Sequence, residues 1–141
     1  MKKLFTVLLA ILIFNACKKE NNTPTTPGTD TRPSGSIIAT AKITEGNTPG
    51  DKANGDAHLF NDNGTWKLYL TNFSTNNGPD LHVYLATTQD AANFIDLGLL
   101  RSTSGDQVYN IIGNPSLASY KYIIIWCKQF SVYFGGGQWM M

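Results

Sequence analysis

The chain has 141 residues, of which 42% are hydrophobic and 15% are charged, with a net charge of +1. A chain of this length supports one domain with a hydrophobic core. It contains no run of five or more basic residues, so the charge pattern gives no support for nucleic-acid binding. Aromatic residues make up 11% of the chain and glycines are numerous, which is typical of a sheet protein with many turns.

The first sixteen residues have the pattern of an export signal. A positively charged start, MKK, is followed by LFTVLLAILIF, whose 11 residues are fewer than the ~20 that a membrane-spanning helix needs. The next stretch, FNAC, is similar to a bacterial lipobox, in which the signal is cut before a cysteine that is then acylated, here Cys17. Phe14 and Asn15 depart from the tightest form of that motif. The alternative is an ordinary secretory signal, and both interpretations predict export.

Lipid on Cys17, such as palmitate, would anchor the exported protein in a membrane. Each buried methylene group contributes about 0.8 kcal/mol, and two or three acyl chains together hold a protein firmly. Cleavage before Cys17 would remove Lys2 and Lys3, leaving 9 basic residues of the original 11 against 10 acidic ones, so the net charge would change from +1 to −1. Because Lys18 rather than an aspartate follows Cys17, the sequence predicts a lipid-anchored envelope protein in the outer membrane of a Gram-negative bacterium.

Residues 17–35 are expected to form a flexible tether after the signal peptide of residues 1–16. Their Pro, Thr and Asn content, with no apolar side chain to join a core after Cys17, is typical of a linker. At ~3.1 Å per residue, the eighteen residues 18–35 would reach at most ~55 Å when extended. The folded domain is therefore predicted to occupy residues 36–141.

The rest of the sequence predicts short strands separated by turns. Alternating apolar and polar residues occur in SIIATAKI, TWKLYL and DLHVYLA, and Asn63-Gly64 between two such runs is a strong hairpin signal. Turn signals recur every ~8–12 residues, and no long segment has helical periodicity. These features predict an all-β fold, an antiparallel β-sandwich of about eight to ten short strands.

Cys127 lies in YKYIIIWCKQFSVYF, residues 120–134, where apolar residues occupy both faces of a predicted strand. Such a strand is usually covered on both sides, and a free cysteine within it acts as a small core residue. Exported proteins, however, usually pair their cysteines, and with Cys17 acylated Cys127 has no partner cysteine in the chain. The sequence leaves a core residue and a reactive thiol both open. A β-bulge at Lys128 and Gln129 would re-aim the thiol toward a sheet edge.

Other chemistry has weaker support in the sequence. His58, His82, Cys127 and two late methionines are the ligand types of a blue-copper site, but no histidine follows the cysteine as such sites require. The sequence lacks the CxxC, HxxxH, CxxCH, GxSxG and HExxH patterns and a phosphate-binding loop, so no metal site is predicted. We interpret His58 and His82 as polar strand residues and Asp80 as a cap of the loop before a strand.

A series of motifs runs in order through residues 55–137: Gly78-Pro79-Asp80-Leu81, Val83-Tyr84-Leu85, Leu97-Gly98, Gly105-Asp106-Gln107, Tyr109, Trp126-Cys127, Phe130 and Phe134-Gly135. Together these motifs resemble the electron-transfer DM-thirteen domain of bacterial exported proteins and of animal extracellular proteins of the Skeletor type. The resemblance implies a β-sandwich. It also implies a redox role for the cysteine, either as a bare thiol or as the ligand of a prosthetic group such as haem, with the neighbouring tryptophan as part of the cofactor site.

Two places depart from the pattern of this family. Asp51 and Lys52 stand where the family often carries a histidine before the glycine that matches Gly55. Near the end, Gly137 and Trp139 replace the usual alanine and leucine.

The sequence therefore favours an exported, lipid-anchored redox or electron-transfer module centred on Cys127, with haem or no cofactor and with a redox partner in the envelope. The alternative is a non-catalytic surface binding or adhesion module in which Cys127 is a core residue. A protein partner would then dock at a loop such as STNNGP or RSTSGD. An enzyme is the weakest option, because no acid–base pair stands out.

Overall fold

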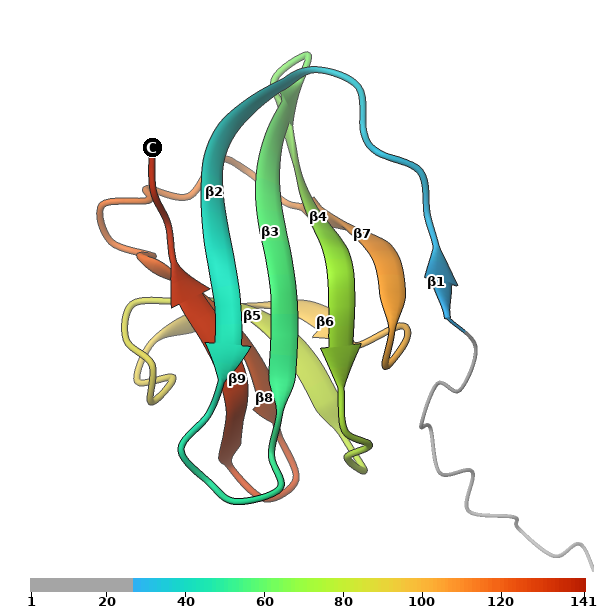
Figure 1. Ribbon diagram of the computed structural model, residues 1–141. Helices are drawn as coiled ribbons and strands as arrows, with labels where there is room; N and C mark the ends of the chain where they lie inside the picture. Colours follow the sequence, from blue (N-terminus) through green and yellow to red (C-terminus); the bar gives the residue numbers. More distant parts are fainter. Residues whose placement is uncertain (1–26) are drawn as a thin grey trace, which may run out of the picture.

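The structure is a computed structural model that describes residues 27–141, drawn in colour in Figure 1. The predicted signal peptide, the expected lipidation site Cys17 and most of the expected tether lie outside the described residues. Residues 27–141 contain no helix that is long and apolar enough to cross a membrane. The strands are β1 (Gly28–Thr29), β2 (Ser36–Glu45), β3 (Ala53–Asp62), β4 (Thr65–Thr75), β5 (Leu81–Ala86), β6 (Phe94–Leu99), β7 (Gly105–Ile111), β8 (Tyr122–Cys127) and β9 (Val132–Gln138).

The nine strands form one continuous sheet that curls over on itself. Their order is β1-β7-β4-β3-β2-β9-β8-β5-β6. Strands β7, β4, β3 and β2 make a first layer, and β9, β8, β5 and β6 make a second layer that faces it (Figure 1). Neighbouring strands pair antiparallel except β1 and β7, which are parallel. The prediction of an all-β antiparallel sandwich is therefore confirmed, with one parallel pair that it did not include.

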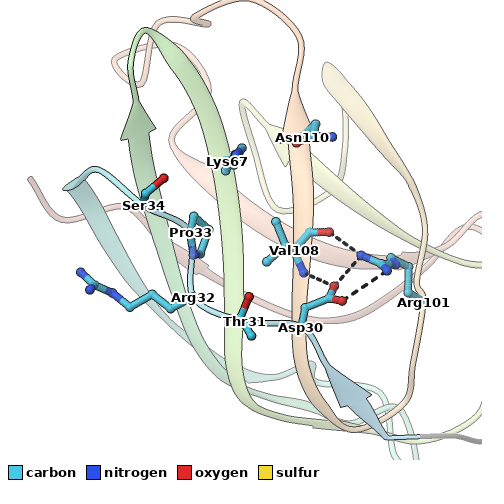
Figure 2. Close-up of a pocket in the computed structure, with 9 residues that line it drawn as sticks. All are labelled: Asp30, Thr31, Arg32, Pro33, Ser34, Lys67, Arg101, Val108 and Asn110. Atoms are coloured by element: carbon cyan, nitrogen blue, oxygen red, sulfur yellow. Dashed lines mark hydrogen bonds and ion pairs between the residues drawn. The ribbon is translucent and has the colours of Figure 1, made fainter.

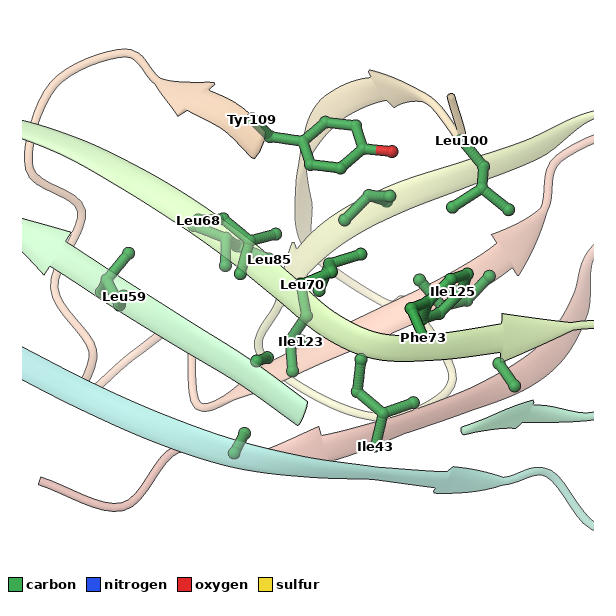
Figure 3. Packing of buried hydrophobic residues seen from close by; sticks show 14 of the residues in the cluster. Ile43, Leu59, Leu68, Leu70, Phe73, Leu85, Leu100, Tyr109, Ile123 and Ile125 are labelled. Atoms are coloured by element: carbon green, nitrogen blue, oxygen red, sulfur yellow. The ribbon is translucent and has the colours of Figure 1, made fainter. Parts of the chain in front are cut away.

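The core lies between the two layers. Leu68 and Leu70 of β4 point inward toward Leu85 of β5 and toward Ile123 and Ile125 of β8 (Figure 3). None of these five side chains is exposed to solvent. Each contributes ~1.5–3 kcal/mol through burial, so this interface is the main source of the stability of the sandwich.

The two layers join where β2 pairs with β9. Thr44 lies opposite Gly136 and Glu45 lies opposite Gly135, so β2 belongs to both layers. A Cβ atom on Gly137 would lie 2.1 Å from the carbonyl oxygen of Lys42, closer than atoms can approach. The glycine run therefore lets the backbones of β2 and β9 come together at the closed edge.

Residues 28–35, which we call the strap, lie against the first layer. Gly28 and Thr29 pair with the start of β7. The carboxylate of Asp30 accepts hydrogen bonds from the backbone N–H of Val108, at 2.9 Å, and from the guanidinium of Arg101 (Figure 2). The strap, which the sequence placed in the tether, is therefore held against the sheet. Polar and backbone contacts hold the strap, and such contacts leave no apolar pattern in the sequence.

Candidate functional site

Cys127 is the last residue of β8 and faces the core. It pairs with Leu81 of β5 and with Val132 of β9. Its exposed fraction is 1%, and it belongs to the same buried cluster as Ile123 and Ile125. Within the described residues it is a free cysteine. The thiol therefore lies among apolar side chains between the two layers.

The prediction of a bulge at Lys128 and Gln129 is wrong. Residues 128–131 form the turn that joins β8 to β9. The bulge lies in β9 instead, because Ile125 pairs with Gly135 whereas the next residue, Trp126, pairs with Tyr133. The extra residue is on β9, so β8 keeps its regular alternation and directs Cys127 inward.

Trp126 lies on the outer face of the second layer, opposite to Cys127. It is half-buried and packs against a small cluster that contains Tyr84 and Ile124. Tyr84 is 1% exposed, and its ring stacks on that of Phe94, with 4.1 Å between centroids and 9° between planes. Because the two neighbours point to opposite faces, Trp126 and Cys127 do not form one site.

A hollow of about 470 Å³ opens beside this cluster on the outer face of the second layer. One wall comes from the loop between β5 and β6, and another from the turn between β8 and β9. We call it the aromatic hollow. Its lining consists of Tyr84, Asp90, Ala91, Phe94, Trp126, Lys128 and Ser131.

His82 lies on the same outer face, between two carboxylates. Its Nε2 atom is 3.1 Å from Oδ1 of Asp80, and its Nδ1 atom is 2.9 Å from Oδ1 of Asp96. The ammonium of Lys128 lies 3.6 Å from the other oxygen of Asp96. Both contacts are hydrogen bonds in two arrangements. Either the imidazole is protonated and donates from both ring nitrogens, or it is neutral and one of the two carboxyl groups carries a proton and donates to the bare nitrogen. His82 is 9% exposed, whereas the side chains of Asp80 and Asp96 are 33% and 28% exposed, so the imidazole is shielded from water and the carboxylates are only partly buried.

Sequence reasoning did not find this cluster. His82 was interpreted as an isolated polar strand residue and Asp80 as a loop cap. The spacing of Asp80, His82 and Tyr84 does put the three on one face of a strand, which was the available signal. Asp96 comes from β6, and only the pairing of β5 with β6 brings it to His82.

The structure does not assemble a blue-copper site. His58 lies on the outer face of the first layer, where its Nε2 atom is 3.3 Å from the hydroxyl of Thr71. His82 lies on the outer face of the other layer, and Cys127 lies between the layers. Across residues 27–141, no group of three metal-ligating side chains is close enough to hold an ion.

The surroundings of Cys127 do not fit a haem ligand. An axial thiolate needs an open face beside the sulfur, where the macrocycle can lie. Here the side chain is 1% exposed and belongs to a packed apolar cluster that includes Leu81 and Phe134. Trp126, which the resemblance placed beside the cofactor, lies on the other side of the strand.

The comparisons with known proteins agree with the order of the sequence motifs. A profile of the family described as Electron transfer DM13 matches residues 47–137. No curated protein matches the chain, and no solved structure matches it. The matched range covers more than half of the chain and includes Cys127, His82 and the aromatic hollow. The chain therefore belongs to the Electron transfer DM13 family.

Proposed function

We propose that the protein is an exported, lipid-anchored electron-transfer module of the cell envelope in which the thiol of Cys127 is the redox group. The observation that carries this proposal is membership of the electron-transfer family over residues 47–137, a range that contains an unpaired thiol. An exported protein rarely keeps such a thiol for packing alone.

The chemistry consistent with a bare thiol is exchange with a disulfide of a partner. The thiolate of Cys127 attacks one partner sulfur, a mixed disulfide forms, and the second partner sulfur leaves as a thiolate that takes up the proton from Cys127. The buried sulfur must first be uncovered. Cys127 immediately precedes the turn of residues 128–131, so local opening at this end of the sheet would be enough to expose it.

The strap supports a particular orientation of the anchored domain. Gly28 pairs with Gly105 at the start of β7, and this end of the first layer also holds the last residue of β4, Thr75. The loop that follows β4 leads directly to Leu81, the partner of Cys127. The strap thus begins at the end of the sandwich where β8 ends at Cys127, which supports an orientation with that end toward the anchor.

The same strap shortens the reach of the anchor. If Cys17 carries lipid, the ten residues 17–26 precede the described part and span at most about 31 Å when extended. The shorter span favours a partner at or near the membrane surface rather than one that is freely diffusing.

The proposal is tested with the full chain purified from membranes in detergent. Acylation would block Cys17, so a thiol reagent would report Cys127 alone, and mass spectrometry would detect the lipid. We expect a small aromatic disulfide to form a mixed disulfide with the native protein, slowly and completely. Cys127→Ser should form none, and Cys17→Ser should lose the lipid. If the thiol reacts only in denaturant, the redox role is wrong.

A non-catalytic binding module is the second candidate, and the 1% exposure of Cys127 favours it. Of the two loops that the sequence suggested for docking, RSTSGD lies against the strap, because Gly28 donates to the carbonyl of Ser104 and Asp30 binds Arg101. Asn76 and Asn77 of the other loop are exposed. A Cys127→Ala protein that captures the same envelope partner as the wild type would favour this function over the first.

A further inference from the structure

The aromatic hollow has the size and walls of a small-ligand site. Its volume of about 470 Å³ lies within the ~300–1,000 Å³ that ligand pockets occupy. Phe94 of β6 and the half-buried Trp126 of β8 supply ring surface, and the buried ring of Tyr84 of β5 lies behind Phe94. Phe94 remains 44% exposed although it stacks on Tyr84, so ring surface is available to a ligand.

Negative charge predominates around these rings. Asp90 lines the hollow, and its carboxylate accepts a hydrogen bond from the hydroxyl of Thr88, which holds the pKa of that carboxyl below its ordinary value. Asp80 and Asp96 flank the neighbouring His82. Against these three carboxylates stand one ammonium, that of Lys128, and the imidazole of His82.

The same carboxylates act on the phenol of Tyr84. The pKa of its phenol is raised to about 12, mainly by burial and to a smaller extent by the carboxylates of Asp96 and Asp80. The phenol therefore stays neutral and adds no charge that would oppose binding of an anion or of a cation. With three carboxylates against the ammonium of Lys128 and the imidazole of His82, the formal charge in and beside the hollow is negative, which favours a cation.

The first layer shows how this protein covers exposed aromatic rings with a cation. On its outer face Phe60 and Tyr69 contact each other with 6.3 Å between ring centroids. The strap places the guanidinium of Arg32 over the ring of Phe60, 4.8 Å from its centroid. Among the described residues, no cation occupies the equivalent place over the rings of the aromatic hollow.

We propose that the aromatic hollow binds a small organic cation of the alkylammonium class. Ring faces attract such cations through the ring quadrupole, and quaternary ammonium groups are recognised in this way. The carboxylate of Asp90, in the lining, supplies the complementary charge, and that of Asp96 lies next to the lining, 3.6 Å from the ammonium of Lys128. The site involves no redox step and does not depend on Cys127, so it extends beyond the electron-transfer proposal.

The test compares a cation with a neutral molecule of the same shape. Choline and 3,3-dimethylbutan-1-ol differ only in that a carbon atom replaces the positively charged nitrogen. Each is titrated into the full chain in a nonionic detergent, and the heat of binding is measured by calorimetry. We expect choline to bind at least about tenfold more tightly than the neutral alcohol, because only choline gains the attraction to rings and carboxylates.

Four variants locate the site. Trp126→Leu should weaken choline binding about tenfold, and Trp126→Phe, which keeps the space filled, should weaken it less. Asp90→Asn should weaken it about threefold. Lys128→Gln should strengthen it by a similar factor, because this change removes a like charge and releases Asp96. Trp66→Leu, in the separate apolar groove near the C-terminus, is the matched control and should leave binding unchanged.

The proposal is overturned if choline does not bind, or if the neutral alcohol binds within about twofold of choline. It is also overturned if the folded Trp126→Phe and Asp90→Asn proteins bind choline as the wild type does. Cys127→Ser should bind choline normally. A protein whose thiol is inert but which still binds choline would thus disprove the redox role and leave this site standing.

Discussion

The two outer faces of the sandwich differ although one sheet forms both. On the first layer the aromatic pair Phe60 and Tyr69 is covered by the strap, with Arg32 over one ring, and Lys42 and Asp56 form an ion pair farther along. On the second layer the aromatic cluster around Tyr84 is only partly covered, and a hollow remains beside it.

This difference shows where a ligand would act. Aromatic surface on a sheet is costly to leave in water, and the protein covers one such surface with its own chain. The other surface combines open rings with carboxylates and a shielded histidine, an arrangement that packing alone does not require. The first layer therefore carries the strap, and the second layer offers the exposed rings.

The largest difference in stability between substitutions on the two faces is expected at their histidines, His82 and His58. His82→Ala removes hydrogen bonds to two carboxylates, which should lower the free energy of unfolding by about 2–3 kcal/mol. His58→Ala removes one 3.3 Å contact with Thr71 and should cost less than about 1 kcal/mol. Urea denaturation of the purified variants gives both values. Equal losses would mean that the contacts of His82 with the two carboxylates add no more stability than the single contact of His58.

Substitutions of Cys127 test whether its thiol is buried in the core between the two layers. Cys127→Ala leaves a small cavity and should cost about 1 kcal/mol. Cys127→Ser buries a hydroxyl group and should cost about 2 kcal/mol. Denaturant titration measures both free energies. A serine variant as stable as the wild type would show that this side chain meets water, contrary to the 1% exposure of the thiol.

The strap on the first layer can be released by one substitution. Asp30→Ala removes the carboxylate that binds Val108 N–H and Arg101, so stability should fall by about 1–1.5 kcal/mol and the Val108 amide should exchange faster. Hydrogen exchange measured by NMR follows that amide. The control on the second layer is Asp90→Asn, which should change stability by less than about 0.5 kcal/mol. An unchanged Val108 exchange rate would show that the strap does not protect β7.

The smallest effect is expected at the ion pair on the first layer. A hydrogen bond from the ammonium of Lys42 is the main cause that holds the pKa of Asp56 below its usual 3.8. Because the folded state lowers this pKa, the pair stabilises the fold above pH 4 and the contribution is lost as the pH falls. Since both groups are partly exposed, Asp56→Asn should cost less than about 1 kcal/mol at pH 7. Denaturation curves at pH 7 and pH 2.5 compare the two proteins, and a difference that persists at pH 2.5 would contradict this account.

Much of the fold could be predicted because its signals are local. Alternation placed Leu68 and Leu70 on one face of a strand, and both lie in the core. Asn63 and Gly64 adopt positive φ angles of 52° and 88° at the turn between β3 and β4, which is the hairpin that the dipeptide predicted. Alternation along β8 also accounts for Cys127 and Trp126 lying on opposite faces, although the sequence analysis grouped them in one site.

The candidate sites were harder to predict because their parts come from distant segments. The expected bulge was placed at Lys128 and Gln129, whereas the extra residue lies in β9, where the glycine run approaches β2. The strap was taken for tether because Asp30 and Arg32 are polar, and their partners lie some tens of residues away. No sequence pattern connects Asp96 with His82, because only the pairing of β5 with β6 brings them together.

The sequence by itself determined most of the strands, the faces of their side chains and the family, since each of these is carried by short-range alternation and ordered motifs. Only the tertiary structure decided that Cys127 is buried and that the strap closes the first layer. It also decided that rings and carboxylates meet on the second layer. The physical reason is that burial and charge clustering depend on which strands pair, and that pairing joins residues far apart in the chain.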